Sequence, residues 1–553
     1  MSYDLESVSL PRLEGGALAL SASLLTAPVL GKLILKKLMH DAGFDHARKA
    51  QIEEPPSLWP LRPHPKDVGA PIAKDFLQRV PTGDAAKLPR PRVRDYAAAY
   101  RSGSVSPELV ADRILAAIER ADQGSKPLRA FISVLKDDVR AQAKKSAERH
   151  RDGHPLSILD GVPIALKDEM DQAGHPTTVG TAFRTQLVST DSAIAEKLRA
   201  LGAVLIGKAN MHEIGINPTG INARYGQARN PYALDHDTGG SSSGSAAAVA
   251  AALCPIAIGA DGGGSIRIPA GLCGIVGLKA TFGRISERGV VPLCYSVGHA
   301  GPLAASVEDV AIAYAALAGP DPTVPETLTQ PPPTLARYES AKIQGLRIGV
   351  YKPWFEHATA DIVASCRAAL DRLVARGATI VDIEIPELDA MRVAHAVTIL
   401  SEMAASMHVI APDWRGLGAI PRASLALTRV LTAQDFVWAQ QVRTRAVANH
   451  ARVFERCDVI LTPATAITAP RVPQSGVEWS DLSVATELMR YVIAGNLCGY
   501  PGVVVPVGYD HGGLPIGMQV MAPHWEEDRA LGVALALERD AEVRAPALSL
   551  SPL

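Results

Sequence analysis

Two loops rich in glycine and serine constrain this chain most, because both lie within segments that read as packed core. The first, residues 239–245, is Gly-Gly-Ser-Ser-Ser-Gly-Ser and leads into an alanine-rich helix predicted over 245–253. The second, residues 261–265, is Asp-Gly-Gly-Gly-Ser and follows an apolar strand predicted over 255–258. Glycine and serine clusters are usually flexible linkers, but linkers are not flanked by buried helices and strands. We therefore expect two tight loops inside a folded domain.

Apolar strand patterns alternate with helical patterns along most of the chain. Ser106 and Pro107 predict the start of one helix, and residues 192–201 predict another that Gly202 closes, followed by a buried strand over 203–207. Later strands are predicted over residues 346–351, 459–461, 503–506 and 516–521. The alternation predicts an α/β fold, with a large mixed, mostly parallel β-sheet covered by helices.

Proline-rich segments divide the 553 residues into a long main domain and short flanking parts. Residues 54–66 and 87–94 predict extended linkers. We therefore expect an apolar arm with its linkers over 1–91, the main domain over 92–545, and a short tail over 546–553.

The charge balance and the cysteines limit the partners and cofactors that we expect. Lys and Arg number 56 against 57 Asp and Glu, so no excess positive charge favours nucleic acid, and no nucleic-acid binding is predicted. The six cysteines are scattered without zinc or redox spacing, which indicates free thiols in a reducing cytoplasm. The second glycine loop continues with Ile266 and Arg267 rather than the Lys-Ser/Thr of a phosphate loop. We predict no metal and no cofactor.

The N-terminal arm contains a strongly apolar stretch over residues 17–39, interrupted by a proline and a glycine. It is too short and broken to span a bilayer, and acidic residues precede it where a secretory signal carries positive charge. Two interpretations stay open. The stretch packs on the main domain or across a homodimer interface, or it makes peripheral contact with a membrane or lipid through Lys32, Lys36 and Lys37.

Lys167 ends the apolar run 162–166, upstream of both loops. A lysine at a strand end usually extends its ammonium group to water. Beside two serine loops, a second interpretation is stronger: burial lowers the lysine pKa from its usual value of about 10.4, and the neutral amine accepts a proton. Glycines aim several backbone N–H groups at one point, as a developing oxyanion requires. The combination predicts a serine hydrolase site that uses no histidine.

Two other motif matches have weaker support. Residues 240–244 fit Gly-x-Ser-x-Gly with Ser242 at the centre, but that motif follows a strand, and 230–237 is turn-forming. Ser133 and Lys136 fit Ser-x-x-Lys without the partner motifs of the β-lactamases, so we interpret this match as coincidence.

These motifs resemble those of the amidase signature family, and the resemblance runs from about residue 95 to 538. Residues 162–168 are similar to the family's catalytic-lysine segment, 239–245 to its Gly-Gly-Ser-Ser-Gly-Gly-Ser stretch, and 261–267 to its nucleophile loop. Ser243 departs from the family, which has glycine there. The second loop and the apolar arm together resemble the plant-type fatty acid amide hydrolase branch.

The resemblance implies a role for each residue of the site. It makes Ser265 the nucleophile, Ser241, held by a cis peptide bond, the proton relay, and Lys167 the base. It implies an oxyanion hole formed by the backbone N–H groups of Gly262, Gly263, Gly264 and Ser265. It places Gly215, Ile216 and Asn217 at the entrance of the acyl pocket.

Four further residues are expected to support the site rather than react. We interpret Asp261 and Arg267 as a structural ion pair that fixes the second loop, in preference to a catalytic acid and cation. Asp168 is expected to anchor the Lys167 segment, and Ser242 to support the first loop.

The implied function is that of a serine amidohydrolase that forms an acyl-enzyme from a small-molecule amide. Hydrophobic acyl or aryl amides are expected as substrates, together with esters and carbamates. Two alternatives stay open: the glutaminase-type component of a tRNA-dependent amidotransferase, and a noncatalytic binding protein on the same scaffold. The long arm disfavours the first, and the presence of all three reacting residues disfavours the second.

Overall fold

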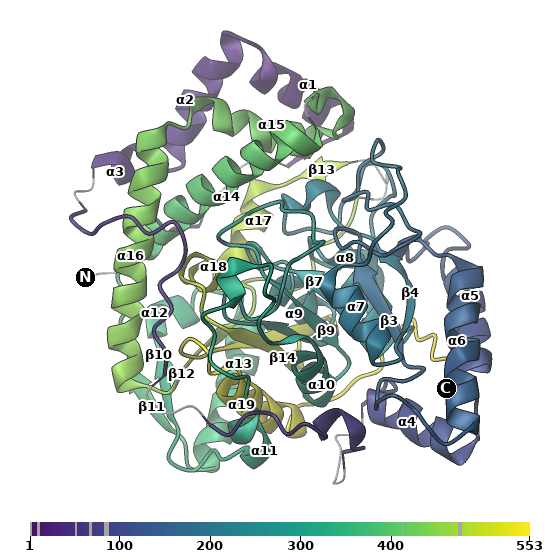
Figure 1. Cartoon of the computed structure of the whole chain (residues 1–553). Helices are drawn as coiled ribbons and strands as arrows, with labels where there is room; N and C mark the ends of the chain where they lie inside the picture. Colours follow the sequence, from purple (N-terminus) through teal and green to yellow (C-terminus); the bar gives the residue numbers. More distant parts are fainter. Residues whose placement is uncertain are drawn as a thin grey trace.

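An eleven-stranded sheet runs through the middle of the molecule, with helices on both faces (Figure 1). The computed structural model describes residues 3–7, 12–49, 52–65, 69–81, 88–411, 413–473 and 478–553. From one edge to the other, the strands are β11 (Thr379–Asp382), β10 (Arg347–Val350), β12 (Val459–Pro463), β15 (Pro515–Met521), β14 (Gly502–Tyr509), β8 (Val276–Lys279), β9 (Ala300–Ala304), β7 (Ile256–Ala260), β3 (Pro163–Lys167), β4 (Val204–Ala209) and β2 (Phe131–Ser133).

The strand directions confirm a mixed α/β sheet but correct its expected parallel majority. Neighbours are parallel only at the flanks, in the pairs β11–β10, β10–β12, β7–β3 and β3–β4. The six other pairs are antiparallel, including β14–β15, which a tight turn closes with Gly513 at φ +82°. A strand buried on both faces is a continuous apolar run in either direction, so its sequence does not reveal its orientation.

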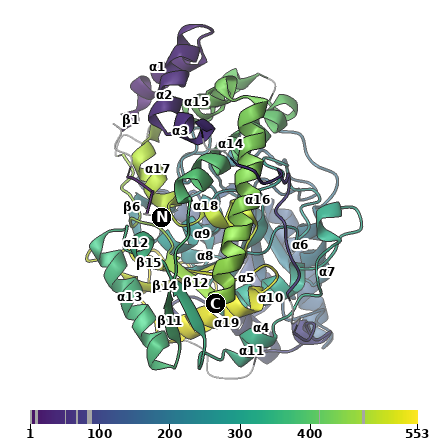
Figure 2. The ribbon, with the colours of Figure 1, turned by 90° about the vertical axis from the view of Figure 1, so that its left-hand side faces the viewer.

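The helices surround this sheet (Figures 1 and 2). Their bounds are α1 (Gly15–Thr26), α2 (Leu30–Asp41), α3 (Phe44–Lys49), α4 (Val93–Ser102), α5 (Pro107–Ala121), α6 (Lys136–Arg151), α7 (Ala193–Ala200), α8 (Ser243–Ala250), α9 (Arg267–Leu272), α10 (Val307–Leu317), α11 (Ala336–Ser340), α12 (Lys352–Phe355), α13 (Ala360–Ala375), α14 (Leu388–Ile410), α15 (Ala419–Ala426), α16 (Ala433–Arg456), α17 (Leu482–Met489), α18 (Ile493–Cys498) and α19 (Glu527–Arg539). Short 3₁₀ turns are η1 (Phe76–Gln78), η2 (Glu213–Gly215), η3 (Pro325–Thr327), η4 (Trp414–Gly416) and η5 (Leu427–Val430). Two-residue strands β1 (Leu13–Glu14) and β13 (Trp479–Ser480) pair with each other, as do β5 (Arg229–Asn230) and β6 (Ala233–Asp237).

Helix ends follow the predicted signals. Ser106 caps α5 by accepting a hydrogen bond from the Leu109 N–H, with Pro107 at the first helical position. Ser192 caps α7 in the same way, and Gly202 takes the left-handed conformation after it, at φ +86°. The predicted cap residues are thereby confirmed. Such signals can be read from the sequence because they depend only on neighbouring residues.

Helix α8 and strand β7 hold the two glycine loops inside the core, as expected. Every residue of both elements is buried. A Cβ at Gly244 would stand 2.2 Å from the Ala130 carbonyl oxygen and 2.3 Å from the Asn210 nitrogen, so only glycine fits there. The first loop is therefore built by close backbone packing, unlike a flexible linker.

The N-terminal arm folds into a bent pair of helices at one end of the molecule (Figure 2), where α1 and α2 meet at 102°. Leu18 and Ala22 of α1 pack against Ile420 of α15, while Leu20 and Leu33 remain 62% and 64% exposed. Two candidates in the described ranges match a membrane-crossing helix in length and composition: this bent pair and α14, which is half buried in the molecule.

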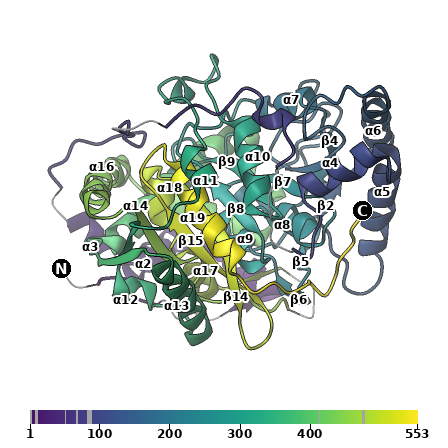
Figure 3. The same ribbon diagram turned by 90° about the horizontal axis from the view of Figure 1, so that it is seen from below.

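The proposed domain boundaries stay predictions. Lys66 and Lys87, at the ends of the predicted linkers, lie outside the described residues. The C-terminal tail crosses the underside of the molecule toward α5 (Figure 3), where the Arg113 guanidinium donates to the Pro552 carbonyl at 3.0 Å.

Candidate active site

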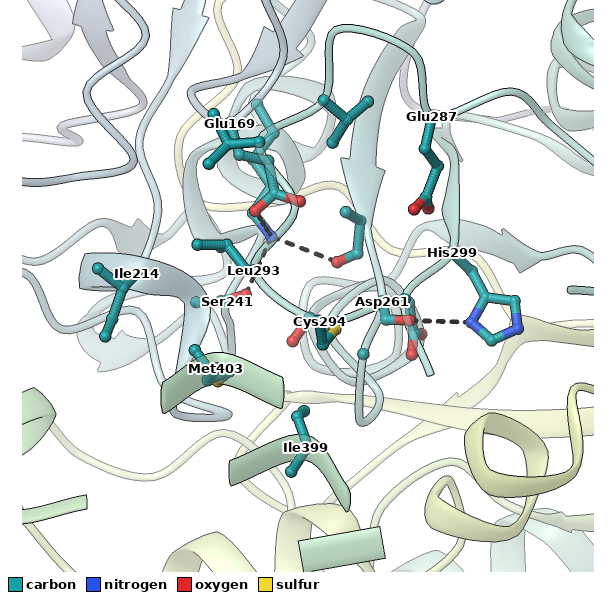
Figure 4. Close-up of a pocket in the computed structure, with 18 residues that line it drawn as sticks. Glu169, Ile214, Ser241, Asp261, Glu287, Leu293, Cys294, His299, Ile399 and Met403 are labelled. Carbon is teal, nitrogen blue, oxygen red and sulfur yellow. Dashed lines mark hydrogen bonds and ion pairs between the residues drawn. The ribbon is translucent and has the colours of Figure 1, made fainter. Parts of the chain in front are cut away.

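The end of β3 and the two glycine loops meet at one pocket with a cavity volume of about 40 Å³ (Figure 4). The residues around it are Lys167, Glu169, Ile214, Gly215, Ser241, Ala260, Asp261, Gly262, Ser265, Glu287, Val290, Val291, Leu293, Cys294, Gly298, His299, Ile399 and Met403. The three residues expected to react, 167, 241 and 265, all line this pocket.

Lys167 extends from the end of β3 into this pocket, and only 1% of the residue is exposed. Its Nζ lies 3.0 Å from Ser241 Oγ, 3.3 Å from the Ala260 carbonyl oxygen and 2.9 Å from Glu169 Oε2. The side chain therefore does not extend to water, the fate of most lysines at strand ends. It is directed at a serine hydroxyl instead.

The first loop presents one of its three consecutive serines to the lysine. The Gly240–Ser241 peptide bond is cis. The Ser242 hydroxyl donates to the Ala260 carbonyl at 3.1 Å, and the Ser243 hydroxyl donates to the Asn210 carbonyl at 3.3 Å. Ser241 is the serine whose hydroxyl contacts Lys167.

The segment before this loop corrects one expectation. Residues 230–237, interpreted as turn-forming, include most of the short hairpin β5–β6. A strand therefore does precede the Gly-x-Ser-x-Gly match. Ser242 is still fully buried and bound to Ala260, whereas the nucleophile of that motif is exposed at the tip of its turn.

Asp261 organises the second loop from within. Its carboxylate accepts from the Arg267 Nε at 3.0 Å and from the N–H groups of Gly264 and Ile266 at 2.7 and 3.1 Å. Burial alone would raise the pKa of Asp261, but the Arg267 guanidinium holds it well below its usual range. Both residues are buried in this ion pair, which matches a structural role better than a catalytic one.

The oxyanion donors differ from the expected set of four. The Gly264 N–H is engaged by Asp261, so the expectation is wrong for Gly264. The N–H groups of Gly262, Gly263 and Ser265 have no hydrogen-bond acceptor in the described part of the chain. A Cβ at Gly263 would lie 2.9 Å from the His395 ring, which explains glycine at that position. The loop therefore offers three free donors beside the pocket.

Ser265 lies at the edge of the pocket and is 8% exposed, which leaves its side chain within reach of a small molecule. Its carbonyl accepts from the Ser242 N–H at 3.3 Å, which joins the two loops directly. Across the described residues, no hydrogen bond links the Ser241 and Ser265 hydroxyls. The hydrogen-bonded contacts that begin at Lys167 Nζ therefore reach Ser241 and do not extend to the Ser265 hydroxyl.

Asp168 points away from the pocket, into the neighbouring strand. It forms a fully buried ion pair with Lys208 of β4 at 3.1 Å and accepts from the Thr178 N–H at 3.1 Å. These contacts attach the residue after Lys167 to β4 and to the loop beyond it.

The three residues expected at the acyl entrance separate in the structure. Gly215 lines the pocket, whereas Ile216 packs into an apolar cluster with Met403 and Met407. Asn217 accepts from the Thr219 N–H at 3.2 Å and hydroxyl at 2.9 Å, so it stabilises the turn before the first loop. Neither Ile216 nor Asn217 lines the pocket.

One histidine also borders the pocket. The Nδ1 of His299 lies 2.8 Å from the Val297 carbonyl and 3.2 Å from that of Asp261, so this nitrogen carries the hydrogen and donates to the backbone. Burial lowers the pKa of His299 well below its usual value. No group of three or more potential metal ligands occurs in the described ranges.

Sequence reasoning missed two carboxylates and one wall of the pocket. Glu169 and Glu287 lie on one side, and Ile399 and Met403 of α14 lie opposite (Figure 4). Glu169 follows Lys167 by two residues, but β3 ends at Lys167 and residues 168 and 169 form a turn, so strand alternation does not predict where the Glu169 side chain lies. Nothing local connects α14 with loops more than a hundred residues away.

Comparisons with known proteins identify the family of this chain. The family model described as Amidase matches residues 112–531. A fatty acid amide hydrolase of Medicago truncatula is 39% identical over 98% of this chain and 94% of its own length. A glutamyl-tRNA(Gln) amidotransferase component from Synechococcus sp. is 36% identical over 80% of this chain and 95% of its own.

A solved structure is similar as well. The peptide amidase of Stenotrophomonas maltophilia superposes with a TM-score of 0.71 at 28% identity, covering 82% of this chain and 98% of that one. The resemblance inferred from the motifs is thereby confirmed. This chain belongs to the amidase signature family and is a hydrolase that cleaves amide bonds.

Proposed function

We propose that this enzyme cleaves hydrophobic acyl or aryl amides with Ser265 as nucleophile, Ser241 as proton relay and Lys167 as base. The observation that carries this proposal is the buried 3.0 Å contact between Lys167 Nζ and Ser241 Oγ, in the pocket that Ser265 also lines. A hydroxyl is a weak nucleophile until a neighbouring base takes its proton, and this contact supplies the route.

The reaction proceeds in two halves. Ser265 Oγ attacks the amide carbonyl carbon while its proton passes to Ser241, and the Ser241 proton passes to Lys167. The N–H groups of Gly262, Gly263 and Ser265 stabilise the oxyanion, each contributing about 3 kcal/mol. The C–N bond then breaks as the proton returns through Ser241 to the amine, and water hydrolyses the acyl-enzyme.

The pocket's apolar side supports an apolar acyl group. Ile214 of η2 and Leu293 face the loops together with Ile399 and Met403 of α14, and aliphatic side chains favour aliphatic or aryl groups over charged ones. The relative named fatty acid amide hydrolase fits the same substrate class. Esters and carbamates carry the same electrophilic carbonyl and are proposed as further substrates.

Labelling with a fluorophosphonate, followed by peptide mapping, tests this proposal. We expect the label on Ser265 and expect hydrophobic amides to compete with it. Label on another serine would reassign the nucleophile. Competition by glutamine alone would favour the glutaminase-type alternative, for which the 36% identical amidotransferase component is the support. Absence of both labelling and turnover would favour a binding protein on this scaffold.

We also propose that the enzyme is cytoplasmic and touches membrane surfaces through its N-terminal arm. Leu20, Val29 and Leu33 are 62%, 75% and 64% exposed, and three exposed lysines of α2 lie near them in sequence. Sedimentation with phosphatidylglycerol vesicles tests this contact, with the double variant Leu20→Ser, Leu33→Ser as control. A dimer in solution that the same variant dissociates would assign the surface to a second copy instead.

A further inference from the structure

The environment of Lys167 contains one charged partner that the proposed reaction leaves unused. Glu169 Oε2 lies 2.9 Å from Lys167 Nζ, and the two side chains are only 6% and 2% exposed. In Figure 4, Glu169 lies at the top of the view and Ile399 at the bottom, with Ser241 between them. A buried carboxylate in contact with the base will affect where the proton of that base resides.

The contacts of Nζ indicate which protonation state this geometry fits. Its three neighbours, Glu169 Oε2, Ser241 Oγ and the Ala260 carbonyl oxygen, match the three N–H bonds of an ammonium group. A neutral amine has two N–H bonds and one lone pair. With the same neighbours, an amine ready to accept a proton from Ser241 therefore needs its third proton to reside elsewhere.

The other titratable groups around the pair leave Glu169 as the acceptor for that proton: Asp261 is paired with Arg267, and burial holds the pKa of His299 well below its usual value. Burial, followed by the charge of Glu169, raises the pKa of Glu287 to about 8, so Glu287 is already protonated at neutral pH. Burial raises the pKa of Cys294 well above its usual value and lowers that of His212 to about 4, so both are neutral. Lys208 of β4 is paired with Asp168.

We propose that Glu169 is a positioning residue for the base: it holds Lys167 against Ser241 and takes up the lysine proton before the nucleophile is activated. The inference rests on the proposed function. One proton moves from Nζ to Oε2, which converts an ammonium–carboxylate pair into an amine and a carboxylic acid. The amine then accepts the Ser241 proton as Ser241 accepts that of Ser265, and the negative charge moves to the oxyanion. As the C–N bond breaks, Lys167 passes a proton through Ser241 to the leaving amine, and the Glu169 proton then returns to Lys167.

This arrangement predicts an unusual pH profile for the wild-type enzyme. The pair is competent while it holds one proton to exchange between Lys167 and Glu169, so kcat/KM should stay level through neutral pH. A lysine that must release its proton to solvent would instead make kcat/KM fall on the acidic side of the pH profile (the acidic limb) at a pH well above 7. A wild-type acidic limb above about pH 8 would overturn the proposal without any variant.

The decisive variant is Glu169→Gln, which keeps the shape and removes the proton acceptor. We expect kcat/KM at pH 7 to fall at least about tenfold and to recover toward pH 9–10, with the acidic limb moved upward by at least about one pH unit. A limb that moves downward would show that Glu169 only stabilises the ammonium form, and an unmoved limb would show a structural role. Either result overturns the proposal.

Glu169→Asp is the matched conservative variant. A shorter carboxylate contacts Nζ less well but still accepts a proton, so we expect a lower kcat with the acidic limb unmoved. Thermal melting of both variants identifies any failure to fold, and Glu169→Asp then carries the test. Failure of the proposed function is separate: it would appear as amide turnover that survives Ser265→Ala, whatever the pH profile.

Discussion

The two glycine loops use internal hydrogen bonds in opposite ways. In the loop over 239–245, the hydroxyls of Ser242 and Ser243 are bound to neighbouring carbonyls, which leaves Ser241 for Lys167. In the loop over 261–265, the Asp261 carboxylate binds the Gly264 N–H and leaves backbone donors beside the pocket. One loop selects a side chain and the other selects backbone groups. Chemical roles here depend on which groups the fold has already engaged.

Ser265→Ala tests the second loop most severely. Because it removes the proposed attacking oxygen, we expect kcat/KM for a hydrophobic amide to fall at least about 10⁴-fold. Steady-state kinetics measures the loss, and thermal melting checks that the fold is kept. Turnover within tenfold of wild type would place the nucleophile elsewhere.

Ser241→Ala and Ser243→Gly separate the serines of the first loop. Among the three consecutive serines of this loop, Ser241 is the one that contacts Lys167, so we expect Ser241→Ala to lower kcat by about 10²–10⁴-fold. Ser243 donates only to the Asn210 carbonyl, so Ser243→Gly should change kcat less than about threefold. Equal losses in the two variants would contradict the selection described above.

Asp261→Asn removes the charge that organises the second loop. Because Arg267 is buried, its loss of a charged partner should cost about 3–5 kcal/mol in the free energy of unfolding at pH 7, measured in urea. The pKa of Asp261 is depressed, so its stabilisation is present above about pH 4 and is lost as the pH falls below that. Asp235→Asn, in an exposed pair with Arg471, is the matched control and should cost under about 1 kcal/mol. Similar costs for the two variants would argue against the ion pair.

Gly264→Ala tests the backbone of the same loop. Gly264 has φ +106°, and its Cβ would stand 2.5 Å from Val492 Cγ2, so we expect a loss of about 1–3 kcal/mol in urea unfolding. Gly319→Ala has a positive φ without a neighbour within 4 Å and reports the backbone cost alone. If Gly264→Ala lowers the free energy of unfolding less than Gly319→Ala does, then contact between the added Cβ and Val492 does not explain the glycine at position 264.

Glu287→Gln should give the smallest effect and one that depends on pH. The pKa of Glu287 is raised to about 8, so the folded state retains a proton that the unfolded chain releases above about pH 4.5. The free energy of unfolding of the wild type, relative to that of the variant, therefore declines as the pH rises from about 4.5 to about 8. We expect the difference in Tm, variant minus wild type, to grow from pH 5 to pH 8. A difference that is constant with pH would show that Glu287 is ionised throughout.

Much of this architecture was accessible from the sequence, because it depends on local patterns. Ser106 and Ser192 are N-cap residues that predict the starts of their helices. Glycines between apolar segments predict the two loops. Strand direction was not accessible, since β8 and β14 read as the same apolar runs in either orientation. The position of Glu169 was not accessible either, because β3 ends at Lys167 and the turn that follows sets the direction of the Glu169 side chain. The wall from α14 depends on long-range packing that no short segment encodes.

That wall has a consequence for how the enzyme could diversify. Ile399 and Met403 line the pocket but belong to a helix separated in the chain from the loops that carry the proposed chemistry. Replacing them with larger or smaller residues would reshape the acyl compartment and leave the hydrogen bonds of both loops in place. The substrate range could therefore change, by evolution or by design, through substitutions on α14 that leave the proposed catalytic residues unchanged.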